Sequence, residues 1–157
     1  SKNELFECEI LHVPGHTSGH ISIYVKEINA LFTGDTLFSL GCGKIFEGTY
    51  SQMYKSLNKF KNYPKNTKIY CGHEYTKKNS DFCISIDSKN KKLINKINEI
   101  KNNIQNNMPT IPSTLEDEIE CNIFLRADNL EIQKQLGINS GDAIKTFAKL
   151  RDLKDNF

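Results

Sequence analysis

The spacing of apolar residues changes near residue 87, and this change constrains the fold more than any other feature of the sequence. Before it, apolar residues alternate with polar ones in short runs, as Ile21, Ile23 and Val25 do, which is the period of a half-buried strand. After it, apolar residues recur every three or four positions, which is the period of one helix face. This helical stripe consists of Leu93, Ile97, Ile100 and Ile104. We therefore predict an α/β (α+β) chain, β-rich over about 1–87 and all-helical over about 88–157.

Local signals place the individual elements. Strands are predicted at 6–10, 21–25, 30–33 and 68–71, with a glycine-containing loop at 34–48. Thr49 and Gln52 have the spacing of a capping box, which predicts a helix that begins there and ends before Pro64. Beyond the long amphipathic helix we predict three shorter ones. Their signals are a cap at Ser113 or Thr114, an apolar pattern at 128–136, and a cap at Asn139 or Ser140.

Composition excludes several classes of protein. With 157 residues, 38% of them apolar and 25% charged, the chain can bury one core, which argues against disordered, collagen-like and membrane classes. Residues 55–101 carry 12 basic and 4 acidic side chains, all the basic ones lysine. Because aromatic and arginine residues are not interleaved with these lysines, we interpret them as a solvated surface and predict no nucleic-acid or membrane partner. Arg126 and Arg151 are the two arginines among 19 lysines, and are candidates for roles that need a planar guanidinium.

The cysteines and the first residues of the chain give information on the cellular compartment of the protein. Five cysteines without a C-x-x-C pair favour buried free thiols in a reducing compartment, so we predict a cytoplasmic protein. The sequence opens at Ser1 without methionine, which we interpret as a sign of processing or of a piece of a longer protein. An organellar form stays open for the same reason.

Three residues with metal-binding side chains follow or flank predicted strands. His16 lies in a glycine-flanked loop between two strands, while Asp35 and His73 each come directly after a short apolar strand and a glycine. Imidazole and carboxylate donors suit zinc or iron. Each residue also has an ordinary interpretation, since a histidine at a strand end commonly makes a structural hydrogen bond and an aspartate after glycine commonly caps a turn. Spacing alone leaves both interpretations open.

Several strings in this chain, in the same order, resemble glyoxalase II, the hydroxyacylglutathione hydrolase branch of the metallo-β-lactamase superfamily. In the first part they are His-Thr-Ser-Gly-His at 16–20, Phe-Thr-Gly-Asp-Thr-Leu-Phe at 32–38, Gly-Cys-Gly-Lys at 41–44 and Tyr-Cys-Gly-His-Glu-Tyr at 70–75. In the second part they are Pro-Ser-Thr-Leu at 112–115, Asn-Ile-Phe-Leu-Arg at 122–126 and Arg-Asp-Leu-Lys-Asp-Asn-Phe at 151–157. The resemblance implies the C-terminal half of a metallo-β-lactamase αββα sandwich at 1–87 and a helical glutathione-binding domain at 88–157.

The resemblance also implies a site. His16 would ligate one divalent metal ion, Asp35 would bridge two, and His73 would ligate the second, the ions being zinc, iron or manganese. His20 matches a position that is not a ligand. The glutathione moiety of the substrate would contact Lys44, Phe46, Tyr75, Arg151 and Lys154.

This sequence departs from the family pattern in two places. Residue 46 is phenylalanine where the family usually has tyrosine, so a phenolic hydrogen bond to the substrate would be lost. The family's first metal motif, T-H-x-H-x-D-H, does not occur in the chain, and three ligands cannot complete two metal shells. We therefore expect a longer parent enzyme that hydrolyses S-D-lactoylglutathione and related thioesters to glutathione and a 2-hydroxy acid, using a metal-bridging hydroxide. The present chain alone should be inactive and should bind metal weakly or not at all.

Two alternatives stay open. Another hydrolase of the superfamily, or a persulfide dioxygenase, should lack the helical tail that ends in Arg-x-x-Lys-Asp-x-Phe. A non-catalytic glutathione-binding or oligomerising fragment is the second alternative. We expect the parent to be a monomer, and the fragment to self-associate through an unpaired strand edge and an exposed core face.

Overall fold

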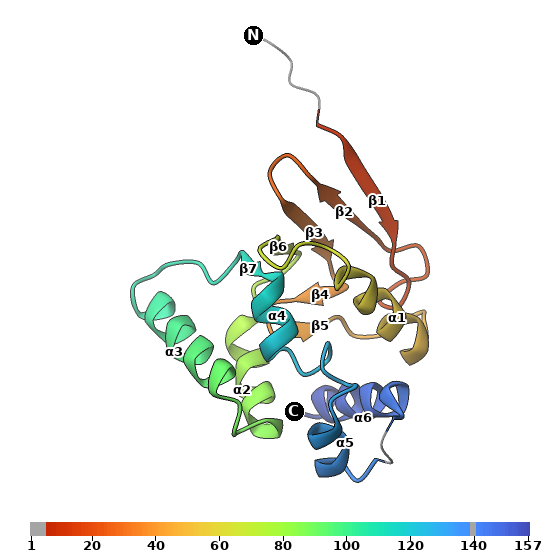
Figure 1. Cartoon of the computed structure of the whole chain (residues 1–157), viewed down its shortest axis with the longest axis vertical. Helices are drawn as coiled ribbons and strands as arrows, with labels where there is room; N and C mark the ends of the chain where they lie inside the picture. The colour runs from red at the N-terminus through yellow and green to blue at the C-terminus, as the bar shows by residue number, and fades with distance from the viewer. Residues whose placement is uncertain (1–5, 139–140) are drawn as a thin grey trace.

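A computed structural model describes residues 6–138 and 141–157, which form a five-stranded sheet, a separate hairpin and six helices (Figure 1). The sheet has the order β1-β2-β3-β6-β7. Its strands are β1 (Cys8–His12), β2 (Ile21–Val25), β3 (Ala30–Gly34), β6 (Lys68–Cys71) and β7 (Ser113–Thr114). All neighbouring pairs are antiparallel except β3 and β6, which run parallel. A parallel pair needs a crossover, and the segment between β3 and β6 contains helix α1 (Tyr50–Phe60).

Helix α1 begins at the predicted capping box. The Thr49 hydroxyl accepts the Gln52 N–H at 3.2 Å, and the Gln52 side-chain oxygen accepts the Thr49 N–H at 2.9 Å. Met53, Leu57 and Phe60 recur on one face of the helix and are fully buried. The predicted start and the predicted end before Pro64 are both confirmed, because local capping chemistry and an apolar stripe specify the same helix.

The two faces of the sheet differ in burial. Leu31 and Ile69 lie side by side on one face and are fully buried. On the other face the strand register aligns four apolar side chains across β1, β2, β3 and β6, namely Ile10, Ile23, Phe32 and Tyr70. Ile10 is 67% exposed and Phe32 is 41% exposed, and the Phe32 ring stacks on Tyr70 with centroids 5.2 Å apart. Self-association through this part of the molecule stays a prediction.

The helical region is largely as predicted. Its helices are α3 (Lys91–Gln105), α4 (Leu115–Cys121), α5 (Leu130–Gln135) and α6 (Ala143–Asp155). Thr114 caps α4, and α3 ends before Pro109. The predicted caps Asn139 and Ser140 lie outside the described residues; Asp142 is the described cap of α6, and its carboxylate accepts the Lys145 N–H at 3.0 Å.

Three elements were not predicted. Strand β7 pairs with β6 at the edge of the sheet, so the prediction of an all-helical segment at 88–157 is wrong there, because a two-residue strand is too short to show alternation. Helix α2 (Thr76–Ile86) carries a mostly polar buried face, so it has no apolar stripe for a periodicity argument to detect. Its buried residues are Thr76, Asn79, Ser80, Phe82 and Cys83. The segment predicted as loop contains a hairpin of two-residue strands, β4 (Leu37–Phe38) and β5 (Gly41–Cys42), which are too short to show alternation.

One hydrophobic core runs through the described molecule. It includes Leu31 from the sheet, Leu57 from α1, and Phe124 and Phe147 from the helical region. The predicted division into domains near residue 87 therefore stays a proposal. Arg126 pairs with Asp87 at the end of α2.

The prediction of buried free thiols is confirmed for three cysteines and wrong for Cys8, which is exposed, and for Cys71, which is half-buried. Cys42, Cys83 and Cys121 are buried, and burial raises the pKa of Cys42 to about 11 and that of Cys83 to about 12. Within residues 6–138 and 141–157, the helices lack the combination of length and apolar character that crossing a bilayer requires.

Candidate functional site

The three predicted metal-ligand residues converge on one point. His16 Nε2 lies 3.5 Å from Asp35 Oδ2, and His73 Nε2 lies 3.6 Å from the same oxygen. Asp35 follows β3 and His73 follows β6, and these strands are parallel neighbours whose C-terminal ends meet at one edge of the sheet. We call these three side chains the histidine–aspartate cluster.

The orientation of His16 is fixed by a main-chain carbonyl. Its Nδ1 lies 2.7 Å from the Lys44 carbonyl oxygen. Because a carbonyl can only accept, Nδ1 is the donor, and Nε2 is the ring nitrogen on the Asp35 side. A histidine held in this way by its second nitrogen is the usual arrangement of a metal ligand.

His20 holds the main chain at Asp35 by a hydrogen bond. The Asp35 main-chain N–H donates to His20 Nε2 at 3.0 Å, so this nitrogen acts as an acceptor. Burial, and then the neighbouring His16, lower the pKa of His20, and both favour the neutral ring that such an acceptor requires. The prediction that His20 is not a ligand is consistent with this role in holding the main chain.

Two glycines let the main chain close around Asp35. A Cβ at Gly72 would lie 2.6 Å from Asp35 Oδ1, and a Cβ at Gly43 would lie 1.9 Å from the Asp35 carbonyl oxygen. Real Cβ atoms do not approach this closely, so glycine is required at both positions. The motifs that contain these loops therefore supply glycines for close packing of the main chain as well as the predicted metal ligands.

The donors of the histidine–aspartate cluster fit a divalent cation. Two ligands of one tetrahedral zinc are about 3.4 Å apart when each bond is near 2.1 Å, which is close to the separations in the cluster. In the part of the chain that the structure describes, however, no group of three or more His, Cys, Asp or Glu side chains is arranged so that it could hold a metal ion. The cluster alone would therefore supply only part of a ligand shell.

A cavity of about 300 Å³ lies beside this cluster, and four of the five predicted substrate-binding residues line it. They are Lys44, Tyr75, Arg151 and Lys154, joined by Phe38, Cys42, Lys78, Asn79 and Asp155. We call this the cationic cavity. Phe46 is not part of its lining; it is 68% exposed and its ring meets His16 edge-on, with centroids 5.0 Å apart.

Arg151 is a buried anchor in the wall of the cationic cavity. It is 5% exposed; one guanidinium nitrogen donates to the Cys42 carbonyl at 2.8 Å and another to Asp155 Oδ1 at 2.8 Å. Its guanidinium carbon lies 5.2 Å from the centroid of the Phe124 ring. The planar guanidinium thus joins α6 to the β5 strand, a role that lysine could not fill.

Lys154 is a partly desolvated cation one helical turn beyond Arg151. Its Nζ donates to the Lys78 carbonyl at 3.0 Å and lies 5.1 Å and 5.2 Å from the centroids of Phe82 and Phe157. Burial, and then the positive charge of Lys78, lower the pKa of Lys154 to about 8. An anion entering the cavity would therefore meet a cation that is poorly hydrated.

Tyr75 and Phe38 join the cluster to the cavity. The Tyr75 ring stacks on His73 at 5.2 Å between centroids, and the Phe38 ring meets Tyr75 edge-on at 5.3 Å. Sequence reasoning did not single out Phe38, Cys42 or Asn79 as site residues. Phe38 and Cys42 lie inside the quoted strings, but only the hairpin fold brings them to the cavity. Asn79 reaches the cavity from α2 and had no signal in the sequence.

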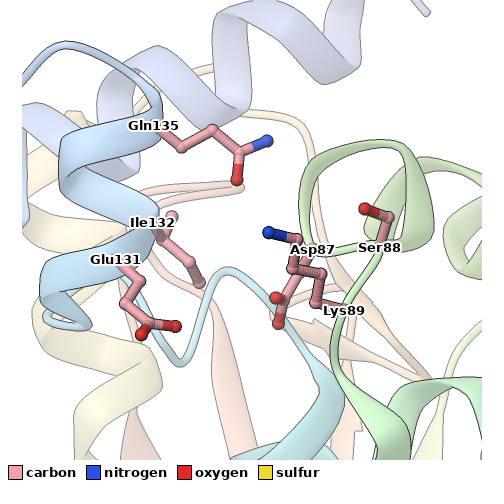
Figure 2. Close-up of a pocket in the computed structure, with 6 residues that line it drawn as sticks. All are labelled: Asp87, Ser88, Lys89, Glu131, Ile132 and Gln135. Atoms are coloured by element: carbon pink, nitrogen blue, oxygen red, sulfur yellow. The ribbon is translucent and has the colours of Figure 1, made fainter.

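A larger cavity, of about 390 Å³, lies between the turn that follows α2 and helix α5 (Figure 2). Its lining is Asp87, Ser88, Lys89, Glu131, Ile132 and Gln135. It contains none of the predicted site residues, and Asp87 is already paired with Arg126. Chemistry therefore favours the smaller cavity as the functional one.

Two family profiles match the chain. A profile described as metallo-beta-lactamase superfamily matches residues 4–73, and one described as hydroxyacylglutathione hydrolase C-terminus matches residues 74–157. The first contains the histidine–aspartate cluster, and the second contains Tyr75, Arg151 and Lys154.

Curated relatives are similar over nearly all of this chain. A hydroxyacylglutathione hydrolase of Pelagibacter ubique is 57% identical over 98% of this chain and 59% of its own length. A protein of Arabidopsis thaliana named hydroxyacylglutathione hydrolase cytoplasmic is 49% identical over 94% of this chain and 58% of its own length. The chain thus spans less than three fifths of the length of these two relatives.

Among solved structures, ETHE1 from Myxococcus xanthus matches with a TM-score of 0.53 and 21% identity, over 98% of this chain and 57% of that one. A likeness at this identity shows the fold alone. The predicted mixed α/β fold class is confirmed.

Proposed function

The chain belongs to the hydroxyacylglutathione hydrolase family of the metallo-β-lactamase superfamily, as its motifs predicted, and from this we propose that the whole protein hydrolyses 2-hydroxyacylglutathione thioesters such as S-D-lactoylglutathione. Water adds to the thioester carbonyl, the C–S bond breaks, and glutathione and a 2-hydroxy acid are released. The observation that carries the proposal is the shared border at Tyr75 between the histidine–aspartate cluster and the cationic cavity.

The histidine–aspartate cluster would hold part of the metal site. His16 and His73 each place Nε2 within 3.6 Å of the same Asp35 oxygen, which suits a carboxylate shared by two ions. Two divalent cations, whether zinc, iron or manganese, would supply an activated water and stabilise negative charge on the thioester oxygen. His20 and the glycines around Asp35 hold its carboxylate in place, so these residues pre-organise the donors.

The cationic cavity would hold the glutathione moiety. Glutathione carries two carboxylates, and Lys44 and Lys154 offer cations on the cavity wall. Tyr75 lies against His73, so a peptide in the cavity would place its thioester next to the cluster. Arg151 contributes by lining the cavity and fixing Cys42, and Phe46 offers a ring contact beside His16.

Further parts of the proposal concern the whole protein. We expect a cytoplasmic monomer that uses neither nucleic acid nor a membrane as partner. The 157-residue chain should be inactive alone, bind metal weakly, and self-associate through its exposed sheet face. Residues 1–87 and 88–157 would correspond to the partial sandwich domain and the glutathione-binding domain.

Thioester hydrolysis by two proteins tests the proposal. The first is the 157-residue chain, and the second is this chain extended by the remaining length of the Pelagibacter ubique relative, both supplied with zinc or iron. We expect loss of thioester absorbance only with the extended protein, and its abolition by His73→Ala but not by His12→Gln. Robust turnover by the short chain, or none by the extended one, would overturn the proposal.

A further inference from the structure

Side chains from two helices hold the main chain of the β4–β5 hairpin. The Leu40 N–H donates to Glu118 Oε2 at 2.9 Å, and the Leu40 carbonyl accepts from Cys83 Sγ at 3.1 Å. The Ser39 carbonyl accepts from Asn79 Nδ2 at 3.0 Å. Buried main-chain groups must be paired, and at the tip of this hairpin side chains do what a neighbouring strand would otherwise do.

Glu118 and Asn122 form one bracket, a turn apart on and just after α4. Asn122 Nδ2 lies 2.9 Å from Glu118 Oε2 and 3.0 Å from the Gly41 carbonyl oxygen, and 3.4 Å from that of Phe38. Both bracket residues are completely buried. The bracket therefore reaches both strands of the hairpin and its turn.

The turn of the hairpin needs such support. Leu40 has a φ of 56°, in the left-handed region that residues other than glycine rarely adopt. A residue held there persists only when its surroundings over-determine its conformation. Glu118 on the N–H and Cys83 on the carbonyl provide that restraint on both sides of the residue.

The other side of the hairpin faces the proposed substrate. Phe38 and Cys42 line the cationic cavity, and the Phe38 ring contacts Tyr75 and lies 6.2 Å from the ring centroid of His73. The Cys42 carbonyl is the acceptor for Arg151. A shift of the hairpin would therefore move the cavity wall, the Arg151 anchor and the ring next to His73 together.

We propose that Glu118, with Asn122, is a positioning residue that sets the shape of the cationic cavity by fixing the β4–β5 hairpin, without contacting substrate itself. The assignment of glutathione as the occupant rests on the proposed function. The positioning role itself rests on the contacts of the free chain.

The charge environment of Glu118 gives the bracket a measurable signature. The groups that face it are Asp117 and Cys121 on the same helix, Cys71 on β6, Cys83 on α2 and the Ser113 hydroxyl on β7. Among the described residues, no lysine, arginine or histidine forms an ion pair with Glu118. Burial raises its pKa to about 7, and Oε1 has no hydrogen-bond partner. A glutamine could therefore replace the protonated carboxyl, accepting from Leu40 while its amide group faces Ser113.

Nuclear magnetic resonance on the free 157-residue chain tests the positioning role. Glu118→Ala should shift the resonances of Phe38 and Cys42, whereas Glu118→Gln and the exposed-helix control Glu120→Ala should leave them in place. The Leu40 amide proton should titrate with a midpoint near the pKa of the Glu118 carboxyl in the unaltered chain and lose this response in Glu118→Gln.

Unchanged Phe38 and Cys42 resonances in a folded Glu118→Ala chain would overturn the inference. The pH titration of the Leu40 amide resonance needs only the unaltered chain and Glu118→Gln. If the resonance does not titrate in the unaltered chain, the inference is overturned even where Glu118→Ala does not fold.

Calorimetric titration with glutathione separates this inference from the proposed function. The unaltered chain and Glu118→Gln should bind with dissociation constants within about twofold, and Glu118→Ala about tenfold more weakly. If the unaltered chain binds no glutathione while the resonances respond as described, the proposed substrate is wrong and the bracket stands. If Glu118→Ala binds as tightly as the unaltered chain, the bracket does not shape this cavity.

Discussion

The histidine–aspartate cluster and the cationic cavity meet at Tyr75, yet they differ in how far apart in the sequence their residues lie. The anchor of the cavity, Arg151, is 5% exposed. The cluster takes its residues from loops at the edge of one sheet. The cavity joins Cys42 to Arg151, which lies 109 positions further along the chain.

This difference shows that the two halves of the site have different structural supports. Close main-chain packing at Gly43 and Gly72 holds the cluster, so added volume should damage it. The docking of α6 holds the cavity, so lost volume under α6 should damage it. Substitutions chosen on each side can therefore separate the two halves, or show that they act as one unit.

The largest effect should come from Phe147→Ala. Phe147 is fully buried under α6 and contacts Tyr54 of α1 and Phe124, with ring centroids 6.0 Å and 5.7 Å away. Removing the ring should cost about 3–5 kcal/mol of unfolding free energy and loosen the cavity before the cluster. Urea unfolding measures the loss, with the exposed Ile144→Ala on the same helix as the control. Equal loosening of both halves would contradict their separate support.

Gly43→Ala should be the next most damaging change, at about 3 kcal/mol of unfolding free energy. The new Cβ would lie 1.9 Å from the Asp35 carbonyl oxygen, so main chain beside the cluster must move. Gly19→Ala is the matched control, because nothing lies within 4 Å of its Cβ and no loss of stability is expected. A Gly43→Ala chain as stable as the control would show that the main chain around Asp35 yields easily.

Stability should depend on pH through Glu118. Its pKa is raised from 4.5 to about 7, chiefly by burial, so the folded chain keeps this proton to higher pH than the unfolded chain. The stabilisation is fully present below pH 4.5 and is lost as pH rises through about 7, on the order of 3 kcal/mol in total. Unfolding by urea between pH 4 and 8 should show this decline in the unaltered chain relative to Glu118→Gln. Parallel curves would mean that the carboxyl is not desolvated as the structure indicates.

The smallest effect should come from Tyr50→Phe. The Tyr50 hydroxyl donates to Asp152, which ties α1 to α6 at the surface, and this hydrogen bond raises the pKa of Tyr50. Losing it should cost about 0.5–1 kcal/mol of unfolding free energy, measured by thermal or urea denaturation. Asp152→Asn keeps an acceptor and should cost less. A cost above that of Gly43→Ala would make this tether a main support of the cavity.

Prediction from sequence succeeded where the signal was local. The capping box at Thr49 specified the start of α1, and the apolar stripe from Leu93 specified α3, because both depend on residues a few positions apart. Helix α2 was not predicted because its buried face includes Asn79 and Ser80. These side chains donate to main-chain carbonyls of the hairpin and of α2 itself instead of forming an apolar stripe. The β4–β5 hairpin was not predicted because the side chains that hold it, Glu118 and Asn122, lie about 80 positions away in the sequence.

The sequence by itself predicted which residues would carry chemistry. His16, Asp35 and His73 follow or flank strands with glycines nearby, and those loops meet wherever the strands pair as their patterns require. The tertiary structure alone decided how the cationic cavity is built: that Arg151 is buried against Cys42, that Lys154 is partly desolvated between aromatic rings, and that Glu118 supports the hairpin. The physical reason is that burial and pairing over such chain distances depend on packing between elements, which no local pattern of residues encodes.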